Sequence, residues 1–119
     1  MPDEKRLPDY LCDNLDIVSI GINPSIHSAN SGYPFSSPRN RFWPAINQSK
    51  LLSRTIEPSP NVLKELLLVE RIGFTDIVKK PTKGIGDLKT TDYKKGADEL
   101  LVKMLKFRPR IAWFQGMTA

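Results

Sequence analysis

The chain has 119 residues and a mass of 13.5 kDa, which is enough for one domain and too little for two domains with separate cores. Its 39% hydrophobic and 26% charged residues are typical of a globular protein and exclude a disordered tail or a fibrous repeat. Eighteen lysines and arginines against 13 acidic residues give a net charge of +5. This charge favours an anionic partner such as nucleic acid, with an ordinary basic surface as the alternative.

Residue counts also exclude two kinds of stabilising site. Cys12 is the single cysteine and His27 the single histidine, so neither an internal disulfide nor a Cys/His zinc cluster can form. We expect no metal and no cofactor. No stretch approaches the roughly 20 apolar residues of a membrane span, and the first residues lack the apolar core of a secretory signal. The sequence therefore predicts an intracellular protein with no membrane partner.

The first predicted element is a buried strand over residues 15–20, which are rich in β-branched side chains and end at Gly21. Residues 23–40 contain three prolines and several glycines, serines and asparagines, so we expect a long loop there. Loops of that length inside compact domains tend to be functional, and this one is the first candidate for a site.

Two helices and a second strand are predicted next. A helix from residue 40 or 41 to about residue 52 accommodates Pro44 in its first turn, where no backbone N–H is needed. Another helix is capped by Asn61, shows helical spacing of its apolar residues and ends near Gly73. Residues 74–78 are then predicted to form a short strand.

The last third of the chain predicts a turn-rich segment, a helix and a strand. Residues 81–86 favour turns, and Thr90 or Thr91 can cap a helix with one apolar face that we expect to lie in the core. That face consists of Tyr93, Ala97, Leu100, Leu101, Met104 and Leu105. Residues 111–114 form a continuous apolar run, which predicts an inner strand covered on both faces, with an edge strand as the alternative.

Strands that alternate with helices predict the α/β class, as a three-layer α/β/α sandwich with a mostly parallel central sheet. Ligand loops of such sheets lie at the carboxyl ends of the strands, and residues 21–24 lie at such an end. An inner strand at residues 111–114 needs further neighbours, so we expect a domain that is incomplete at its C-terminus.

Three short motifs follow the first strand: GINPS at residues 21–25, GYPF at 32–35 and NRFW at 40–43. Each motif alone is common, because Asn-Pro pairs mark turns and an asparagine before aromatic residues marks a helix start. In this order and spacing they resemble the mismatch-specific uracil and thymine DNA glycosylases of the uracil-DNA glycosylase superfamily.

Further segments extend the resemblance. LDIV at residues 15–18, GFTD at 73–76 and RPRIA at 108–112 are similar to the eukaryotic thymine-DNA glycosylase branch of that family, so the likeness covers about residues 7–119. It implies a uracil-DNA glycosylase-like fold. It also implies an enzyme of base-excision repair that flips uracil, with thymine as a second candidate, out of a mispair with guanine and hydrolyses the N-glycosidic bond.

The resemblance assigns roles to the motif residues. Asn23 stands at the position whose asparagine positions the hydrolytic water, and an amide can do this through its carbonyl oxygen. Gly21 and Ile22 would contact the base through the main chain, and Phe35 would stack on it. By residue chemistry alone, a turn role for Asn23 and a loop anchor for Phe35 are the alternatives.

Asp76 and Thr82 stand at secondary base-binding positions of the family. In the animal thymine-specific members the counterpart of Asp76 is an asparagine, and a carboxylate would repel the departing anionic base unless it faces away or is protonated. A surface or capping role for Asp76 is the alternative. Pro34 stands where the thymine-acting animal enzymes have a histidine, which favours uracil over thymine.

Basic residues in loops near the strand ends are expected to contact the DNA backbone and to make binding salt-dependent. These residues are Arg39, Arg41, Lys79, Lys80 and Lys83.

His27 has no acid or thiol at motif spacing, which argues against a catalytic dyad, and no lysine lies at a motif position for Schiff-base chemistry. We therefore expect a monofunctional hydrolase that does not cleave the DNA strand.

Two departures limit the resemblance. Ser25 stands where many members have glycine. Members of the family also continue to a Pro/Ser-containing loop that wedges into the duplex, and we find no such segment after residues 117–119. We therefore expect residues 1–14 to be an N-terminal extension and residues 15–119 to be a C-terminally truncated, partial glycosylase domain.

Two other functions are considered beside the glycosylase. A catalytically inactive DNA-binding fragment would keep the +5 charge and the motif loop without base release. A generic small-molecule enzyme is disfavoured, because no Gly-rich phosphate loop follows the first strand.

The expected partner is double-stranded DNA with a G·U or G·T mismatch, and the expected oligomeric state is a monomer. The resemblance implies that the protein is located in the nucleus.

Overall fold

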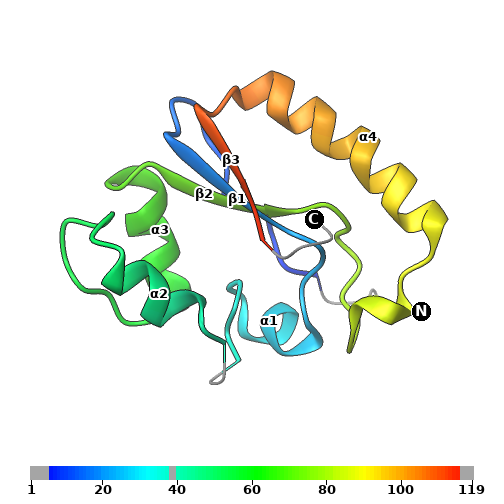
Figure 1. Cartoon of the computed structure of the whole chain (residues 1–119), viewed down its shortest axis with the longest axis horizontal. Helices are drawn as coiled ribbons and strands as arrows, with labels where there is room; N and C mark the ends of the chain where they lie inside the picture. Colours follow the sequence, from blue (N-terminus) through cyan, green and yellow to red (C-terminus); the bar gives the residue numbers. More distant parts are fainter. Residues whose placement is uncertain (1–5, 38–39, 116–119) are drawn as a thin grey trace.

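The structure is a computed structural model that describes residues 6–37 and 40–115 (Figure 1). Within these residues no helix has the length and apolar character needed to cross a membrane. The elements in chain order are β1 (Ile17–Gly21), α1 (Ile26–Ser31), α2 (Phe42–Gln48), α3 (Pro60–Leu68), β2 (Ile72–Asp76), a 3-10 helix (Ile85–Asp87), α4 (Thr90–Phe107) and β3 (Ile111–Phe114).

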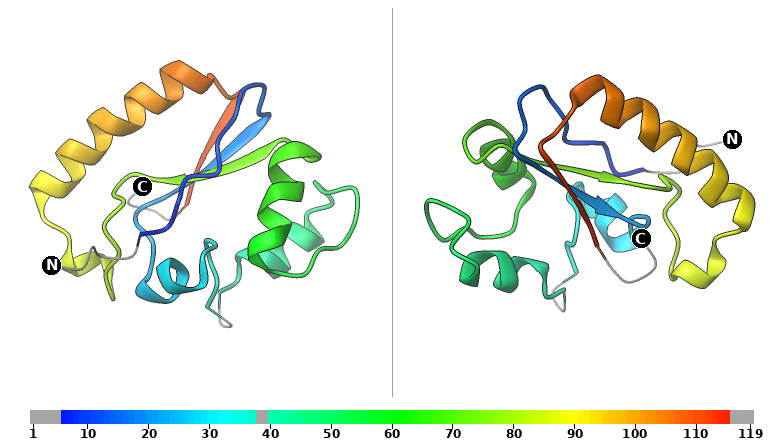
Figure 2. Two further views of the ribbon diagram at one scale, coloured as in Figure 1. Left: turned by 180° about the vertical axis from the view of Figure 1, so that it is seen from behind. Right: turned by 45° about the horizontal axis from the view of Figure 1, so that its top comes forward.

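The three strands form one parallel sheet in the order β2-β1-β3. Ile17, the first residue of the central strand β1, pairs with Ile72 on one side and with Ile111 on the other. Helix α4 covers one face of the sheet, and α2 and α3 lie on the other (Figures 1 and 2). This arrangement confirms the predicted α/β class with a parallel sheet between helical layers.

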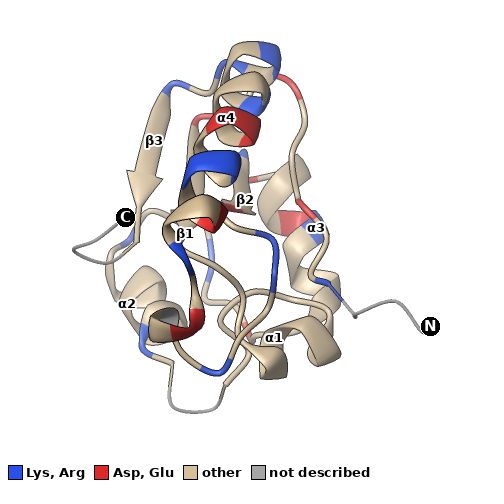
Figure 3. Ribbon diagram, turned by 90° about the vertical axis from the view of Figure 1, so that its right-hand side faces the viewer, with Lys and Arg blue, Asp and Glu red and all other residues tan. Residues whose placement is uncertain are grey.

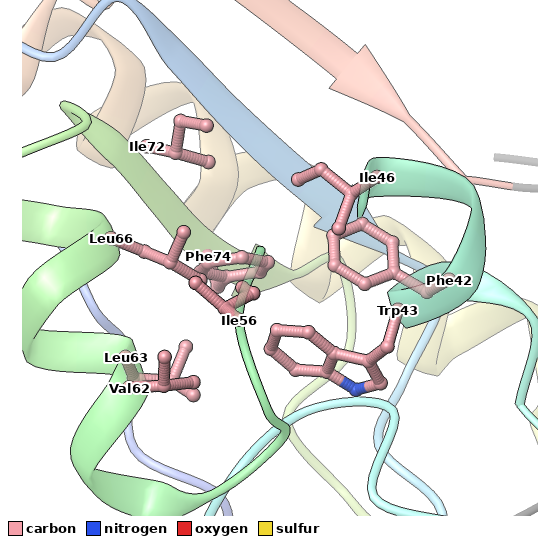
Figure 4. Packing of buried hydrophobic residues seen from close by; sticks show 9 residues of the cluster. All are labelled: Phe42, Trp43, Ile46, Ile56, Val62, Leu63, Leu66, Ile72 and Phe74. Atoms are coloured by element: carbon pink, nitrogen blue, oxygen red, sulfur yellow. The ribbon is translucent and has the colours of Figure 1, made fainter. Parts of the chain in front are cut away.

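Alternation along β1 builds a core on both faces of the sheet, because successive strand residues point to opposite sides. Val18 and Ile20 are fully buried and pack with Leu100 and Met104 of α4. The larger cluster lies on the opposite face, beneath α2 and α3 (Figure 4). It consists of Phe42, Trp43, Ile46, Ile56, Val62, Leu63, Leu66, Ile72 and Phe74.

The long loop predicted at residues 23–40 contains a short helix. Ser25 caps α1, its Oγ accepting a hydrogen bond from Ser28 N at 3.0 Å, and Gly32 ends the helix with a left-handed φ of 86°. A helix of six residues has no room for an apolar period, so the sequence pattern did not indicate it. Helix α2 ends at Gln48, before the predicted residue 52, and Lys50 is left-handed.

The start of α3 and the position of Gly73 differ from the prediction. Ser59 caps α3 through a hydrogen bond from Val62 N to its Oγ at 3.1 Å, and Asn61 lies inside the helix. Gly73 lies within β2 and does not end the helix. A Cβ at Gly73 would lie 2.6 Å from the Tyr10 carbonyl oxygen, so glycine is required by the passing N-terminal segment.

Residues 6–14, assigned by the sequence to an extension, lie against the sheet. Tyr10 and Phe74 exchange two backbone hydrogen bonds of 2.9 Å, which forms an antiparallel bridge on the outer edge of β2. Leu7 is buried, and Tyr10 Oη donates to Gly32 O at 2.6 Å. The domain boundary at residue 14 stays a prediction, but the segment before it covers the edge of β2.

The apolar face predicted for α4 is only partly in the core. Leu100 and Met104 pack on β1, whereas Leu101 and Leu105 are 59% and 58% exposed. The buried ridge follows the i, i+4, i+8 spacing from Gly96, because α4 approaches the Ile77 carbonyl there. This orientation turns the neighbouring leucines away from the sheet.

Residues 111–114 form a strand as predicted, but within the described residues it is not covered on both sides, and the further neighbour expected for an inner strand stays a prediction. β3 pairs with β1 along one side and forms an edge of the three-stranded sheet. Ile111 is 56% exposed, and only Trp113 packs against the larger core cluster.

The close approach at Gly96 leads to a stability prediction. A Cβ there would lie 2.1 Å from Ile77 O, so we expect Gly96→Ala to lower the free energy of unfolding by about 1–3 kcal/mol, despite the better helix propensity of alanine. Urea unfolding measures the effect. Gly84→Ala is the control, because a Cβ at Gly84 meets nothing within 4 Å, and its effect should stay within about 0.5 kcal/mol. Equal stability of the two variants would contradict the packing described for α4.

Candidate functional site

The loops that follow β1 and β2 are joined by backbone hydrogen bonds. Gly21 O accepts from Ile77 N at 2.8 Å, and Ile22 O accepts from Val78 N at 2.9 Å. Further along, Ser25 forms a parallel bridge with Thr82. The two carboxyl-end loops therefore form one surface, at the edge of the sheet where parallel α/β proteins bind their ligands.

The Asn23 side chain is held by this second loop. Its Nδ2 donates to the Lys80 carbonyl oxygen and to Thr82 Oγ1, both at 2.9 Å. A carbonyl oxygen can only accept, so the amide nitrogen must face Lys80. Thr82 Oγ1 in turn donates to Gly84 O at 2.8 Å. Both hydrogen bonds that the described residues make with the Asn23 amide use its nitrogen, which leaves Oδ1 as the available acceptor.

Asn23 lines a cavity of about 310 Å³ at these strand ends. This volume lies at the small end of the range for small-molecule sites. The cavity is lined by Leu7, Gly21, Ile22, Asn23, Pro24, Ser25, Ser28, Pro34, Phe35, Asn40, Asp76 and Gln115. It thus brings together five of the predicted residues, whereas Thr82 contacts Asn23 and is not part of the lining.

Phe35 is fixed in place by its backbone and by its aromatic neighbours. Its φ of 57° is left-handed, and its carbonyl oxygen accepts a hydrogen bond of 2.9 Å from Trp43 Nε1. Its ring stacks on Phe42 with centroids 4.4 Å apart and meets Phe74 edge-on at 6.4 Å. A left-handed phenylalanine stores strain, and such residues persist where the surrounding structure determines them.

Asp76, the last residue of β2, is 8% exposed and lines the cavity. It lies opposite Gly21, where a Cβ would approach Asp76 Oδ1 to 2.5 Å, so glycine makes room for the carboxyl group. Burial raises the pKa of Asp76 to about 6, the nearby positive charge of Lys79 opposes this, and the negative charge of Asp9 adds to it.

Asp9 occupies the centre of the ion cluster beside Asp76. Its Oδ1 lies 2.7 Å from Lys79 Nζ, its Oδ2 lies 2.7 Å from Lys103 Nζ, and Thr75 Oγ1 donates to it at 2.8 Å. Burial alone would raise the pKa of Asp9, but the charge of Lys79 and the hydrogen bonds from the two lysines and Thr75 lower it below 3.8. Asp9 is therefore ionised near neutral pH, whereas Asp76, with a pKa of about 6, changes its protonation state not far below neutral pH.

The predicted DNA-contacting residues fall into three groups. Lys80, Lys83 and Arg41 are exposed, the first two in the loop that holds Asn23 and the third beside the lining residue Asn40. Lys79 is 16% exposed and forms ion pairs with Asp9 and Asp76, at 2.7 and 3.5 Å. Arg39 lies outside the described residues. Figure 3 shows that basic positions on α4 alternate with acidic ones, so that helix does not present a purely basic face.

Sequence reasoning missed Leu7, Asn40 and Gln115 as lining residues and Asp9 as the partner of Lys79. Gln115 reaches the site because it follows β3 and its Nε2 donates to Ser19 Oγ at 3.0 Å. The position of residue 115 just after a parallel strand was the available signal. No comparable pattern marked residues 7–9.

His27 is hydrogen-bonded within the loop region that follows β1. His27 Nδ1 lies 2.6 Å from Ser36 Oγ and ties α1 to the loop after it. No carboxylate accompanies this pair in the described hydrogen bonds, so it has no third group to orient the imidazole for catalysis. Within residues 6–37 and 40–115, no group of His, Cys, Asp and Glu side chains could hold a metal ion.

The raised pKa of Asp76 predicts a pH-dependent stability. The folded pKa of about 6 lies above the ordinary value of 3.8, so the folded state binds this proton more tightly than the unfolded state. The stabilisation is complete below pH 3.8 and is lost as the pH rises through 6. Asp76→Asn should therefore raise the free energy of unfolding at pH 8 by on the order of 2 kcal/mol and change it little at pH 4. Urea unfolding at both pH values checks this; a loss of stability at pH 8 would contradict the burial of an unneutralised carboxyl group.

Comparisons with known proteins identify the family of this chain. The family model of the uracil DNA glycosylase superfamily matches residues 8–119. A relative from Schizosaccharomyces pombe (strain 972 / ATCC 24843), named a G/U mismatch-specific uracil DNA glycosylase, is 35% identical over 108 residues. That alignment covers 91% of this chain and 33% of the relative, so the chain spans about a third of the relative's length. Since the family model spans nearly the whole chain and the relative is 35% identical, the chain belongs to the uracil DNA glycosylase superfamily.

Proposed function

We propose that this protein is a DNA glycosylase that hydrolyses the N-glycosidic bond of uracil mispaired with guanine in double-stranded DNA, with thymine as a second candidate base. Membership of the superfamily and the name of the 35% identical relative support this proposal. The observation that carries it is the Asn23 amide, anchored through its nitrogen with Oδ1 available beside a cavity at the sheet edge.

The proposed reaction needs a positioned water and does not need a strong base. The C1′–N1 bond breaks with its electron pair going to the base, the water oxygen bonds to C1′, and a water proton ends on the released uracil. Because positive charge develops on the sugar, water attack is helped by orientation and by hydrogen bonding to the departing base. Asn23 Oδ1 would accept a hydrogen bond from this water and thereby aim its oxygen at C1′.

The base would enter the cavity after flipping out of the duplex. Phe35, held by Phe42 and Trp43, would stack on it, because a ring face accepts any flat heterocycle. Gly21 and Ile22 would lie along its edge as main-chain contacts. Pro34, buried in the lining, offers no hydrogen-bond donor for a thymine-specific contact, in keeping with uracil as the first candidate.

The Asn23 role leads to the first activity test. We expect Asn23→Ala to reduce the single-turnover rate of uracil release from a G·U duplex by at least about a hundredfold, because the water loses its acceptor. Asn61→Ala is the matched control, since Asn61 is exposed on α3 and far along the chain from the site. Equal rates for the two variants would refute the assigned role of Asn23.

The DNA backbone is the proposed partner of the exposed lysines beside the cavity. We expect the logarithm of duplex affinity to fall linearly with the logarithm of salt concentration between 50 and 200 mM, because bound lysines displace counterions. Lys80→Ala and Lys83→Ala should each reduce this slope by about 1, whereas Lys64→Ala on α3 should not change it. Fluorescence anisotropy measures the slope, and a slope near zero would exclude a DNA-binding surface here.

The two measurements together separate the alternatives. Salt-dependent binding without uracil release by the unchanged protein would favour the inactive DNA-binding fragment over the enzyme. Release that depends on Asn23 would favour the enzyme. The monomeric state and the nuclear location are part of the proposal through the family resemblance alone.

A further inference from the structure

Asp76 is the one ionisable side chain among the described residues that line the cavity. Its two oxygens have different surroundings. Oδ2 lies 3.5 Å from Lys79 Nζ, whereas Oδ1 lies over Gly21 and takes part in no hydrogen bond with the described residues. The oxygen without a protein partner therefore belongs to a group that faces the proposed base site.

The two lysines near Asp76, Lys79 and Lys103, form their shortest ion pairs with Asp9. Lys79 Nζ is closer to Asp9 than to Asp76, at 2.7 against 3.5 Å, and Lys103 Nζ lies 2.7 Å from the other oxygen of Asp9. The charged groups that face Asp76 are thus Lys79 from its own loop, Asp9 from the N-terminal segment and Lys103 from α4. Asp9 therefore pairs with both lysines at short range, and the charge of Asp76 is only partly neutralised.

The hydrogen-bonding edge of uracil combines a carbonyl oxygen, which accepts, with a ring N–H, which donates. A neutral carboxyl group presents the complementary pair, an O–H donor and a C=O acceptor, while a carboxylate presents acceptors only. We propose that Asp76 binds the base as a neutral carboxylic acid, its O–H donating to a uracil carbonyl oxygen and its other oxygen accepting from the ring N–H. This inference rests on the proposed glycosylase function and names a determinant of its pH dependence.

The proposed contact between the Asp76 O–H and the base oxygen would affect the rate of the reaction as well as binding. Negative charge moves onto the base oxygens as the C1′–N1 bond breaks, so an O–H donor at this place stabilises the transition state and a carboxylate destabilises it. The pKa of about 6 for Asp76 means that the donor form dominates below pH 6 and is lost above it. Uracil release should accordingly slow as the pH rises through this value.

The experiment compares the unchanged protein with Asp76→Asn in single-turnover release of uracil from a G·U duplex, at saturating protein, from pH 5 to pH 8. The rate constant of the unchanged protein should be level below about pH 6 and fall about tenfold for each pH unit above it. The amide offers the same donor and acceptor at every pH, so the variant should give a level profile and exceed the unchanged protein by roughly a hundredfold at pH 8.

The pH at which the rate of the unchanged protein begins to fall, the break in its pH profile, provides a second readout. Asp9→Asn removes a negative charge that raises the pKa of Asp76, so the break should move to lower pH. Lys79→Met removes a positive charge that lowers the pKa of Asp76, and the break should move to higher pH. Asp98→Asn is the control, because it makes the same charge change at an exposed position on α4, and it should leave the break in place.

The outcomes distinguish this inference from the function on which it rests. Parallel profiles for the unchanged protein and Asp76→Asn, or a variant that is slower at every pH, would overturn the neutral-acid role and leave the glycosylase proposal standing. Absence of uracil release by the unchanged protein at every pH would overturn both. Breaks that move in opposite directions for Asp9→Asn and Lys79→Met support the inference even if Asp76→Asn changes binding in other ways.

Discussion

The candidate site depends on the hydrogen bonds that join the loop after β1 to the loop after β2. Without them, residues 21–25 would be a proline-containing loop with many conformations, because glycine, asparagine and serine each tolerate several backbone states. Paired to residues 77–82, the loop presents Asn23 with its amide nitrogen already occupied. The side chain thus reaches its position through folding, and no binding energy has to be spent on orienting it.

Around this loop the protein places two carboxyl groups in contrasting surroundings. Asp9 is paired with two lysines and is held in its ionised form, whereas Asp76 lies over a glycine at the cavity with one longer contact to Lys79. Two carboxyl groups whose surroundings give them different pKa values commonly have different roles. Here the division separates a structural anion, which ties the N-terminal segment to α4, from a carboxyl group that lines the cavity and has a raised pKa.

Much of the fold and part of the site could be predicted from the sequence. The alternation of short apolar runs with helical patterns predicted the parallel sheet, and the end of the first run placed Gly21 and Asn23 at the edge where ligands bind. The second strand was predicted two residues too late, at 74–78 and not 72–76, so Asp76 was assigned to the site through the family resemblance and not through its place at a strand end. The orientation of α4 could not be predicted, because its apolar stripe is wider than the ridge that touches the sheet and the contact at Gly96 is a tertiary one. Leu7, Asp9 and Gln115 were missed for a similar reason, since their roles come from distant segments and not from a local pattern.

The bridge between Tyr10 and Phe74 has a practical consequence for anyone shortening this protein at its amino end. A version that starts at residue 15 would leave the outer backbone groups of β2 unpaired and open to another chain, a common route to aggregation. It would also remove the phenol that holds the Gly32 carbonyl, and with it one of the ties on the loop that carries Phe35. Residues 6–14 are thus part of the folded unit, and removing them would also take Leu7 out of the lining of the cavity.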